Sequence, residues 1–321
     1  MEIQDGAELC FPHLSNSSCK KPASSPSDLV LLQIMMSSLS VVTVTLNLLI
    51  IISVSHYRQL HTPTNILLLS LAISDFLVGL LLMPLEIVRN TTCWFLGNLM
   101  CSLYNYLSYI ITSASIGDMV LISIDRYVAI CDPLHYPTRV TERRVKSVVC
   151  LSWLCSVLYN TLFLKDDLNE RGKLSYCYGE CIYFIAHITG TIDIVITFIV
   201  PITVIIVLYM RVFVVAVSQA RTMRSHITAV TLQLSVSQTR KSELKAARTL
   251  GVLVVVFLIC FCPYYCVSLV GDVSVVFYLF YLNSCLNPLI YALFYPWFRK
   301  VVKLIIALQI LQPGSCETSI M

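Results

Sequence analysis

The chain has 321 residues, of which 57% are hydrophobic and only 12% are charged, and its mean hydropathy is +0.79. A soluble domain usually carries about a quarter charged residues, and so little charge cannot cover a surface that faces water. The composition therefore excludes an ordinary soluble protein and indicates that lipid is the natural solvent of this chain.

Seven apolar blocks follow one another along the chain, each long enough to cross a bilayer as a helix of roughly 20 residues. A segment that spans lipid must satisfy its own backbone hydrogen bonds, so blocks of this length predict helices. The predicted helices cover about residues 29–55, 65–88, 98–131, 144–164, 184–216, 244–270 and 274–295. We therefore expect an all-α membrane protein with a seven-transmembrane helix bundle.

The ends of the chain are expected to lie outside this bundle. Residues 1–28 form a polar leader without the small-residue cleavage site of a signal peptide. Residues 29–295 form the transmembrane domain, and residues 296–321 form a tail. The tail begins with the basic, amphipathic run 299–306, which favours a short helix lying on the membrane surface in contact with lipid.

The basic residues lie mainly on one side of the predicted bundle. If the leader is outside, 16 of the 22 Lys and Arg residues fall on the opposite side. This asymmetry predicts an extracellular amino terminus and a cytoplasmic carboxyl terminus. The net charge of +4 is thus explained by topology and does not indicate nucleic-acid binding.

Two N-x-[ST] sequons, at Asn16 and Asn90, fall on the predicted outer side and are candidate glycosylation sites.

Polar residues, prolines and a few aromatic residues inside the apolar blocks mark the class of protein. Buried polar groups and prolines are costly in membrane helices, so each needs a reason. In chain order these residues are Asn47, Asp75, Asp125, Arg126, Tyr127, Trp153, Pro201, Pro263, Asn283, Asn287, Pro288 and Tyr291. The set, in this order over seven predicted spans, resembles the rhodopsin-like family of G-protein-coupled receptors over nearly the whole chain.

A narrower resemblance lies in the last predicted helix. Residues 283–298 read N-S-C-L-N-P-L-I-Y-A-L-F-Y-P-W-F, which fits the signature N-S-x-x-N-P-x-x-Y-x-x-x-Y-x-W-F of trace amine-associated receptors at every fixed position. The resemblance implies a receptor for small volatile amines in olfactory neurons, coupled to a stimulatory heterotrimeric G protein that raises cyclic AMP. It also implies a multi-pass protein of the plasma membrane in sensory-neuron cilia.

An amine receptor needs an acid that pairs with the protonated ligand, because a buried ammonium requires a counter-charge. Most aminergic receptors carry this acid seven residues after Cys101, where the present chain has Ser108. Asp193 lies eight residues before Pro201, level with the expected ligand pocket in helix five. Some fish members of the family carry the amine-binding acid there, so we expect Asp193 to anchor the amine. The alternative is that Asp193 pairs with His187 or a tyrosine and is only structural.

Glu86 in helix two is a second candidate acid with two interpretations. It could receive the other end of a diamine, or it could be a solvated rim residue that pairs with Arg89, three residues on.

Aromatic rings complete an amine site through cation–π attraction and shape. The remaining expected ligand-binding residues, by motif position, are Ser108, Thr112, Thr197, Tyr264, Tyr265 and Tyr281. Asp118 is expected to make a buried polar contact only.

The resemblance also implies a switch on the cytoplasmic side. Arg126 is expected to pair with Asp125 and with Glu243 in the resting receptor, in a latch that breaks when helix six swings out toward the G protein. The further expected switch residues are Tyr127, Tyr209, Asn287, Pro288 and Tyr291. The cluster that resembles a sodium site of inactive relatives is Asp75, Asn47, Asn283 and Asn287.

Six cysteines lie on the predicted outer side, where an oxidising environment allows disulfides. They are Cys10, Cys19, Cys93, Cys101, Cys177 and Cys181. The resemblance implies a disulfide between Cys101 and Cys181. Cys177 is then expected to pair with either Cys10 or Cys19, and the sequence leaves both possibilities open.

Other classes of protein fit less well. A channel or transporter should show internal repeats or paired broken helices, and the sequence has neither. It also lacks H-E-x-x-H, G-x-S-x-G and phosphate-binding glycine motifs, so we expect no enzymatic activity and no cofactor.

Pro263 and Asn287 are only 24 positions apart, which shortens the connection between helices six and seven relative to other members. A receptor-like protein with impaired binding or signalling is therefore the alternative.

Overall fold

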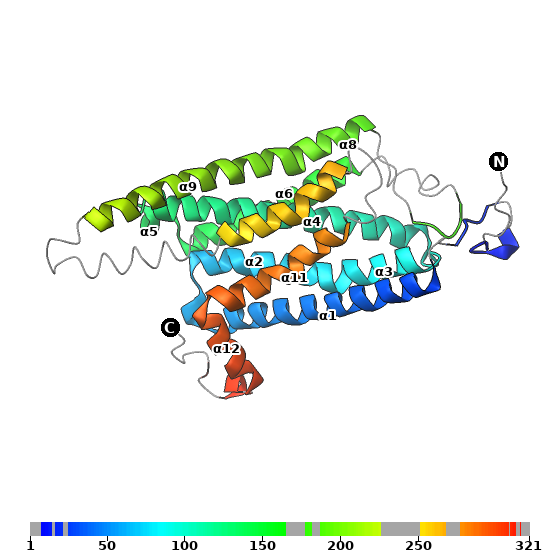
Figure 1. The fold of residues 1–321 in the computed structure, drawn as a ribbon, viewed down its shortest axis with the longest axis horizontal. Helices are drawn as coiled ribbons and strands as arrows, with labels where there is room; N and C mark the ends of the chain where they lie inside the picture. The colour runs from blue at the N-terminus through cyan, green and yellow to red at the C-terminus, as the bar shows by residue number, and fades with distance from the viewer. Residues whose placement is uncertain are drawn as a thin grey trace.

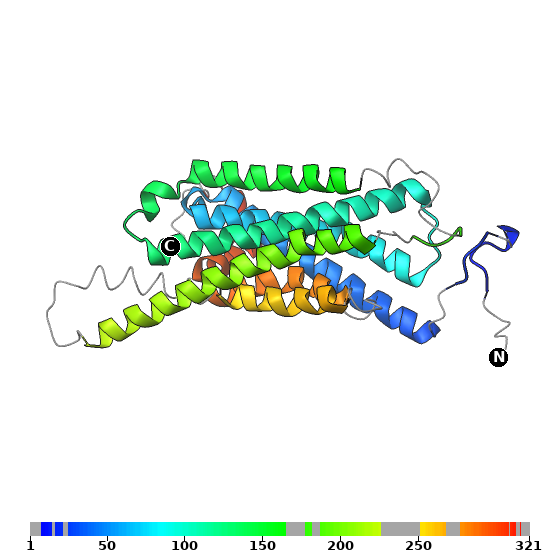
Figure 2. The same ribbon diagram turned by 90° about the horizontal axis from the view of Figure 1, so that it is seen from above.

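The computed structural model describes residues 8–14, 17–21, 25–164, 177–181, 187–225, 251–267, 277–307, 309–312 and 315. Within these residues the chain forms long helices that lie side by side in an elongated bundle (Figure 1). The view from above shows the same long helices side by side, with the amino-terminal segment projecting from one end (Figure 2). The bundle belongs to an all-α, seven-transmembrane architecture.

The long helices of the bundle follow the predicted order. They are α1 (Pro26–His56), α2 (Pro63–Leu77) continued by η3 (Val78–Leu82) and α3 (Met83–Thr91), α4 (Gly97–Cys131), α6 (Glu142–Phe163), α8 (His187–Ile194) continued by η4 (Val195–Ile199) and α9 (Val200–Ser225), the helix Gly251–Val267, and α11 (Phe277–Phe294). The shorter elements are η1 (Pro12–Leu14), η2 (Arg58–Leu60), α5 (Tyr136–Arg139), α12 (Pro296–Ile306) and η6 (Gln309–Leu311).

Five helical stretches among the described residues are long and apolar enough to cross a membrane. They are Pro26–His56, Pro63–Thr91, Gly97–Cys131, Glu142–Phe163 and Ile188–Val215. The outer face of α6 is apolar and exposed: Leu151, Leu154 and Leu158 are each more than half exposed. A continuous apolar stripe is unfavourable in water but suits contact with lipid.

Helix ends differ from the predicted ones where capping residues or polar sequence extend the helix. α1 begins at Pro26 because the Ser25 side chain caps it by accepting from the Asp28 backbone N–H at 3.2 Å. α9 continues to Ser225 rather than residue 216, since apolar sequence marks only the lipid-spanning part of a helix. Residues 244–250 and 268–276, which include the short connection between helices six and seven, lie outside the described residues.

Two π-helical turns, η3 and η4, interrupt the helices next to the candidate acids. Each is followed by a proline two residues after its last residue, Pro84 and Pro201. Proline has no N–H and clashes with the carbonyl four residues before it, and a wider turn accommodates this clash. The extra residue per turn also rotates one half of the helix against the other. The turns therefore help set the faces on which Glu86 and Asp193 lie.

Helix α4 lies at the centre of the bundle and packs against α2, α6 and α9. Its approach to α6 is close at Gly117, where an added Cβ would meet the Ser152 hydroxyl at 2.5 Å. Nearby, the Ser70 hydroxyl of α2 donates to the Asp118 carboxylate at 2.8 Å and accepts from the Trp153 indole N–H at 3.0 Å. Asp118 thus makes a fully buried polar contact that links α2, α4 and α6.

Candidate functional site

Two disulfides join the amino-terminal segment to one end of the bundle, and a third joins α4 to residues 177–181 at the same end. We call this end the disulfide end, and the opposite end, where α5 and α12 lie (Figure 1), the Arg126 end, because Arg126 is near the carboxyl end of α4. The pairs are Cys10–Cys93, Cys19–Cys177 and Cys101–Cys181. Cys177 therefore pairs with Cys19 and not with Cys10. Cys10 instead pairs with Cys93, which had no expected partner from the sequence, although six cysteines on one side favour three pairs.

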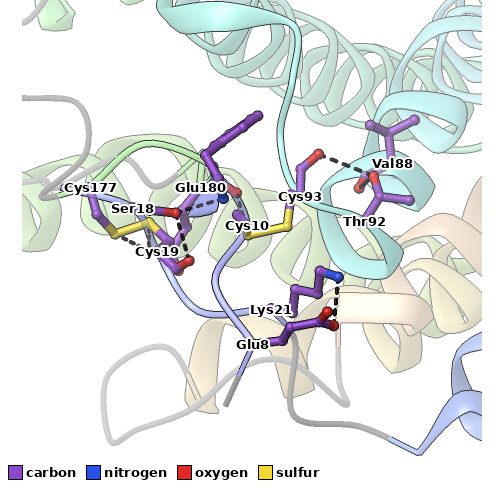
Figure 3. Close-up of a disulfide and its surroundings, with 12 residues drawn as sticks. Glu8, Cys10, Ser18, Cys19, Lys21, Val88, Thr92, Cys93, Cys177 and Glu180 are labelled. Atoms are coloured by element: carbon purple, nitrogen blue, oxygen red, sulfur yellow. Dashed lines mark hydrogen bonds and ion pairs between the residues drawn. A yellow bond between two sulfur atoms is a disulfide. The ribbon is translucent and has the colours of Figure 1, made fainter. Parts of the chain in front are cut away.

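Figure 3 shows the Cys10–Cys93 and Cys19–Cys177 disulfides and the Lys21–Glu8 ion pair of the same segment. Backbone hydrogen bonds also hold this segment in place. The Cys19 N–H donates to the Tyr178 carbonyl at 2.8 Å, and the Tyr178 N–H donates to the Ser17 carbonyl at 2.7 Å. The Trp94 N–H donates to the Gly179 carbonyl at 2.8 Å. The leader, the start of α4 and residues 177–181 thus form one cross-linked cap over the disulfide end.

Gly179 is tightly constrained in this cap, and its replacement by alanine is expected to destabilise the protein. Its φ of +109° favours glycine, and an added Cβ would meet the Cys10 Cβ at 2.7 Å. We expect a loss of about 2 kcal/mol in stability, measured as a lower melting temperature in detergent and less protein at the cell surface. Gly97→Ala is the matched control, because Gly97 has the same kind of backbone strain at φ +77° but no atom within 4 Å of the added Cβ, so its loss of stability should be smaller. Equal losses for both variants would contradict the prediction.

Asp193, the expected amine anchor, is buried on α8 with 7% of its surface exposed. The Tyr159 hydroxyl of α6 donates to its Oδ1 at 2.9 Å, so the structure gives the acid a tyrosine partner that the sequence did not single out. No ion pair within the described side chains includes Asp193, and the side chain of His187 lies outside them. One neutral hydroxyl does not compensate a buried carboxylate, so the site favours a cation.

The residues expected around Asp193 come from three helices. Thr197, one turn on, donates its hydroxyl to the Asp193 carbonyl at 2.8 Å. Tyr265 is buried, hydrogen bonds with Thr197 and stacks on Phe198 with ring centroids 3.8 Å apart. Ser108 and Thr112 lie one turn apart on α4 and are both half-buried.

Glu86, the second candidate acid, is buried in α3 and is not the solvated rim residue of one interpretation. Arg89 pairs with its Oε1 at 2.7 Å, as that interpretation expected, and the Asn90 amide donates to the same oxygen at 2.8 Å. The Tyr104 hydroxyl donates to Oε2 and lies 3.4 Å from the Tyr281 hydroxyl. Glu86 is buried because α3, α4 and α11 converge there. Asn90, a candidate glycosylation site, is half-buried; Asn16 lies outside the described residues.

Five aromatic residues connect the two acids, and we call them the aromatic wall. They are Phe261, Tyr264 and Tyr265 of the Gly251–Val267 helix, with Phe280 and Tyr281 of α11. Their ring centroids lie 4.9 Å apart for Phe261 and Phe280, and 5.6 Å for Phe280 and Tyr281. Tyr264 connects the two helices of the wall, since its ring centroid lies 5.2 Å from that of Tyr265 and 6.2 Å from that of Phe280. The wall therefore extends from Tyr265, which stacks on Phe198 of η4, to Tyr281, whose hydroxyl lies 3.4 Å from that of Tyr104 beside Glu86.

At the opposite end, Arg126 is buried in a polar cluster. Asp125 accepts from the Arg126 Nε at 3.0 Å and from the Thr64 hydroxyl at 3.0 Å. The Tyr136 hydroxyl of α5 donates to Asp125 Oδ1 at 2.8 Å. Burial and the adjacent negative charge of Asp125 raise the pKa of Tyr136 to about 12, so the hydroxyl keeps its proton and donates. Thr64 and Tyr136 carried no sequence signal for this contact, and the expected partner Glu243 lies outside the described residues.

Two other expected switch residues are Tyr127 and Tyr209. Tyr127 packs against Ile130 and Val212. The Tyr209 hydroxyl is buried and lies in the neighbourhood of Arg126. The hydroxyls of Tyr209 and Tyr291 have no hydrogen-bond partner within the described part of the chain. The unsatisfied Tyr209 hydroxyl provides an acceptor for Arg126 in a second arrangement.

A third buried group lies midway along the bundle. The Asn287 amide donates to Asp75 Oδ2 at 2.7 Å, and the Asn47 amide donates to the Ser284 carbonyl at 3.1 Å. Pro288 follows Asn287 inside α11. Within this group, four buried oxygens lack a hydrogen-bond partner among the described residues: Asn47 Oδ1, Asp75 Oδ1, Asn283 Oδ1 and Asn287 Oδ1. Acceptor-only oxygens with one formal negative charge fit a hard monovalent cation.

Comparison with known proteins first defines the class. Residues 46–291 match the family described as 7 transmembrane receptor (rhodopsin family), so the chain is a multi-pass membrane receptor of that family and not an enzyme. The chain is 37% identical to trace amine-associated receptor 13c of Danio rerio over 338 residues, covering 98% of this chain and 97% of that protein.

Two mammalian relatives are similar to the chain over most of its length. Trace amine-associated receptor 1 of Mus musculus is 35% identical, with 89% of this chain and 91% of that protein covered. Trace amine-associated receptor 5 of Rattus norvegicus is 37% identical, with 94% and 93% covered. The chain therefore belongs to the trace amine-associated receptors, which implies an amine ligand and a G-protein partner in general terms.

Proposed function

We propose that this receptor binds a small protonated amine at Asp193 and signals through a stimulatory G protein that raises cyclic AMP, in olfactory sensory cilia. The observation that carries the proposal is Asp193, a buried carboxylate whose described partner is one tyrosine hydroxyl. An ammonium ion supplies the missing positive charge. Ser108 occupies the helix-three position at which most aminergic receptors carry the acid. The ammonium group of the ligand therefore points toward helix five in this proposal, and not toward helix three.

The proposed topology places the disulfide end outside the cell and the Arg126 end in the cytoplasm. Disulfides persist in an oxidising environment, which supports the first assignment. The excess of basic residues at the other end supports the second. Helix α12 then lies on the inner leaflet, with Arg299, Lys300 and Lys303 near the lipid headgroups.

The ligand body lies against the aromatic wall in this proposal. Tyr264 and Tyr265 offer ring faces to the ammonium group next to Asp193, and Thr112 and Thr197 offer hydroxyls at nearby turns. Contact with these rings biases the position of the Gly251–Val267 helix. Displacement of that helix releases Arg126 from Asp125 toward Tyr209, which exposes the G-protein site.

The test is a cyclic-AMP assay on full-length receptor in cultured cells, with a panel of primary amines and the alcohols of the same carbon skeleton. We expect at least one amine to raise cyclic AMP and the matching alcohol to be inactive, because only the amine carries a charge. Surface labelling ensures that receptor is present. If no amine acts through any G protein while receptor is at the surface, the chain is a receptor-like protein with impaired binding or signalling.

The buried oxygens of Asn47, Asp75, Asn283 and Asn287 are proposed to hold a sodium ion that stabilises the resting arrangement. Replacing sodium with a large organic cation at constant ionic strength is then expected to lower the amine EC50 a few-fold in the wild type. Asp75→Asn removes the only formal charge of this cluster, so its EC50 is expected to be independent of sodium.

The control for this prediction is Asp118→Asn, which changes another buried acid that bonds Ser70 instead. This variant is expected to keep the sodium effect. A sodium effect that persists in Asp75→Asn would show that these four residues do not hold the ion.

A further inference from the structure

The Glu86 carboxylate is already fully engaged within the protein. Arg89 contributes a charged hydrogen bond at 2.7 Å, the Asn90 amide contributes one at 2.8 Å, and the Tyr104 hydroxyl binds the other oxygen. Three donors and one formal positive charge therefore compensate the acid. A ligand ammonium group would have to displace one of them to reach Glu86.

Exposure differs sharply between the two members of this ion pair. The Arg89 side chain is 28% exposed, whereas that of Glu86 is 1% exposed. The Arg89 guanidinium also lies over the Tyr104 ring, 5.8 Å from its centroid. A molecule that approaches the pair thus meets the arginine, and the carboxylate lies behind it.

The pair adjoins the proposed amine site. Tyr281 contacts Tyr104 at 3.4 Å between hydroxyls and belongs to the aromatic wall. Tyr264 follows in the wall, with its ring centroid 6.2 Å from that of Phe280 and 5.2 Å from that of Tyr265, and Tyr265 stacks on Phe198, five residues after Asp193. One end of the wall therefore carries an acid without a described cationic partner, and the other end carries an acid whose charge is cancelled.

We infer that Arg89 determines the ligand class of this receptor, which takes amines with a single ammonium group and an uncharged far end and rejects diamines. The inference rests on the proposed function, because it assumes that the ligand ammonium pairs with Asp193. A second ammonium at the far end of a diamine would meet the guanidinium of Arg89. Like charges brought together in a desolvated site are strongly unfavourable.

The same geometry predicts that removing the charge of Arg89 creates a diamine site. Arg89→Gln keeps a hydrogen-bond donor near Glu86 but leaves the buried carboxylate without a cation. An uncompensated buried charge is costly, so the second ammonium group of a diamine can pair with Glu86 in place of the arginine. The improved diamine response should disappear when Glu86 is also neutralised.

The experiment compares 1-aminopentane with 1,5-diaminopentane on full-length receptor at equal surface density, by cyclic-AMP dose–response curves. The readout is the ratio of diamine EC50 to monoamine EC50 within each variant, which cancels differences in expression. We expect a ratio of at least about 10 in the wild type and a decrease of at least about tenfold in Arg89→Gln. Glu86→Gln with Arg89→Gln is expected to restore the preference for the monoamine.

Glu86→Gln alone provides an independent test if Arg89→Gln does not reach the surface. It leaves the arginine charge uncompensated, so the ratio should rise above that of the wild type. A wild type that prefers the diamine, or a ratio that neither variant changes, would overturn the inference while leaving amine binding at Asp193 intact. If 1-aminopentane and the wider amine panel fail on the wild type, the proposed function fails, and this inference fails with it.

Discussion

Asp193→Asn is expected to raise the EC50 of the best amine about 100-fold or more, since the exchange removes the charge and keeps the shape. The asparagine oxygen still accepts from the Tyr159 hydroxyl, which lies 2.9 Å from Oδ1 in the wild type. What is lost is the pairing of a buried carboxylate with the ligand ammonium. Truncating one partner of such a pair costs roughly 2–5 kcal/mol, and about 3 kcal/mol corresponds to roughly a 100-fold change in affinity.

Tyr159→Phe is the matched control for this prediction. It removes a neutral hydrogen bond of about 1 kcal/mol and leaves the Asp193 charge in place, so the EC50 should change only a few-fold. Both variants are measured by cyclic-AMP dose–response at equal surface density. If Asp193→Asn responds like the wild type, Asp193 is only structural, and the contact with Tyr159 is its whole role.

The position of Asp193 could be predicted from the sequence because it depends on spacing along one helix. The distance to Pro201 places the acid on helix five, and helical rise is the same in every protein. The partner Tyr159 could not be predicted, because it lies 34 residues earlier on α6. Its contact depends on how α6 and α8 pack, which spacing along one helix does not determine.

Glu86 shows the same limit more clearly. Its pairing with Arg89 follows from a spacing of three residues on one helix turn. Its burial does not, because Tyr104 and Tyr281 are 177 residues apart and meet only in the folded bundle. The two interpretations of Glu86 from the sequence, solvated or ligand-binding, both assumed that the carboxylate was accessible.

The cap at the disulfide end was only partly predictable, for a different reason. Six cysteines in an oxidising environment favour three pairs, but sequence spacing does not determine which ones form. The pairing depends on backbone contacts between the leader and residues 177–181, such as the bond from the Cys19 N–H to the Tyr178 carbonyl. These contacts place Cys19 next to Cys177 and leave Cys10 next to Cys93.

Asp125→Asn is expected to raise basal cyclic AMP about fivefold at equal surface density. In the structure Asp125 holds Arg126 through a buried ion pair and is itself held by Thr64 and Tyr136. An asparagine loses the ion pair and can turn its amide donors toward the guanidinium. If the resting arrangement loses about 1 kcal/mol relative to the active one, the ratio of the two changes about fivefold.

Asp132→Asn is the matched control, since it makes the same exchange seven residues later. Asp132 is 36% exposed and pairs with His135 and Arg139 at the surface. Such exposed pairs contribute little, so basal signalling should not change. Tyr136→Phe removes one hydrogen bond to Asp125 and should give a smaller increase than Asp125→Asn. Equal basal activity of Asp125→Asn and Asp132→Asn would mean that the contact between Asp125 and Arg126 does not hold the receptor at rest.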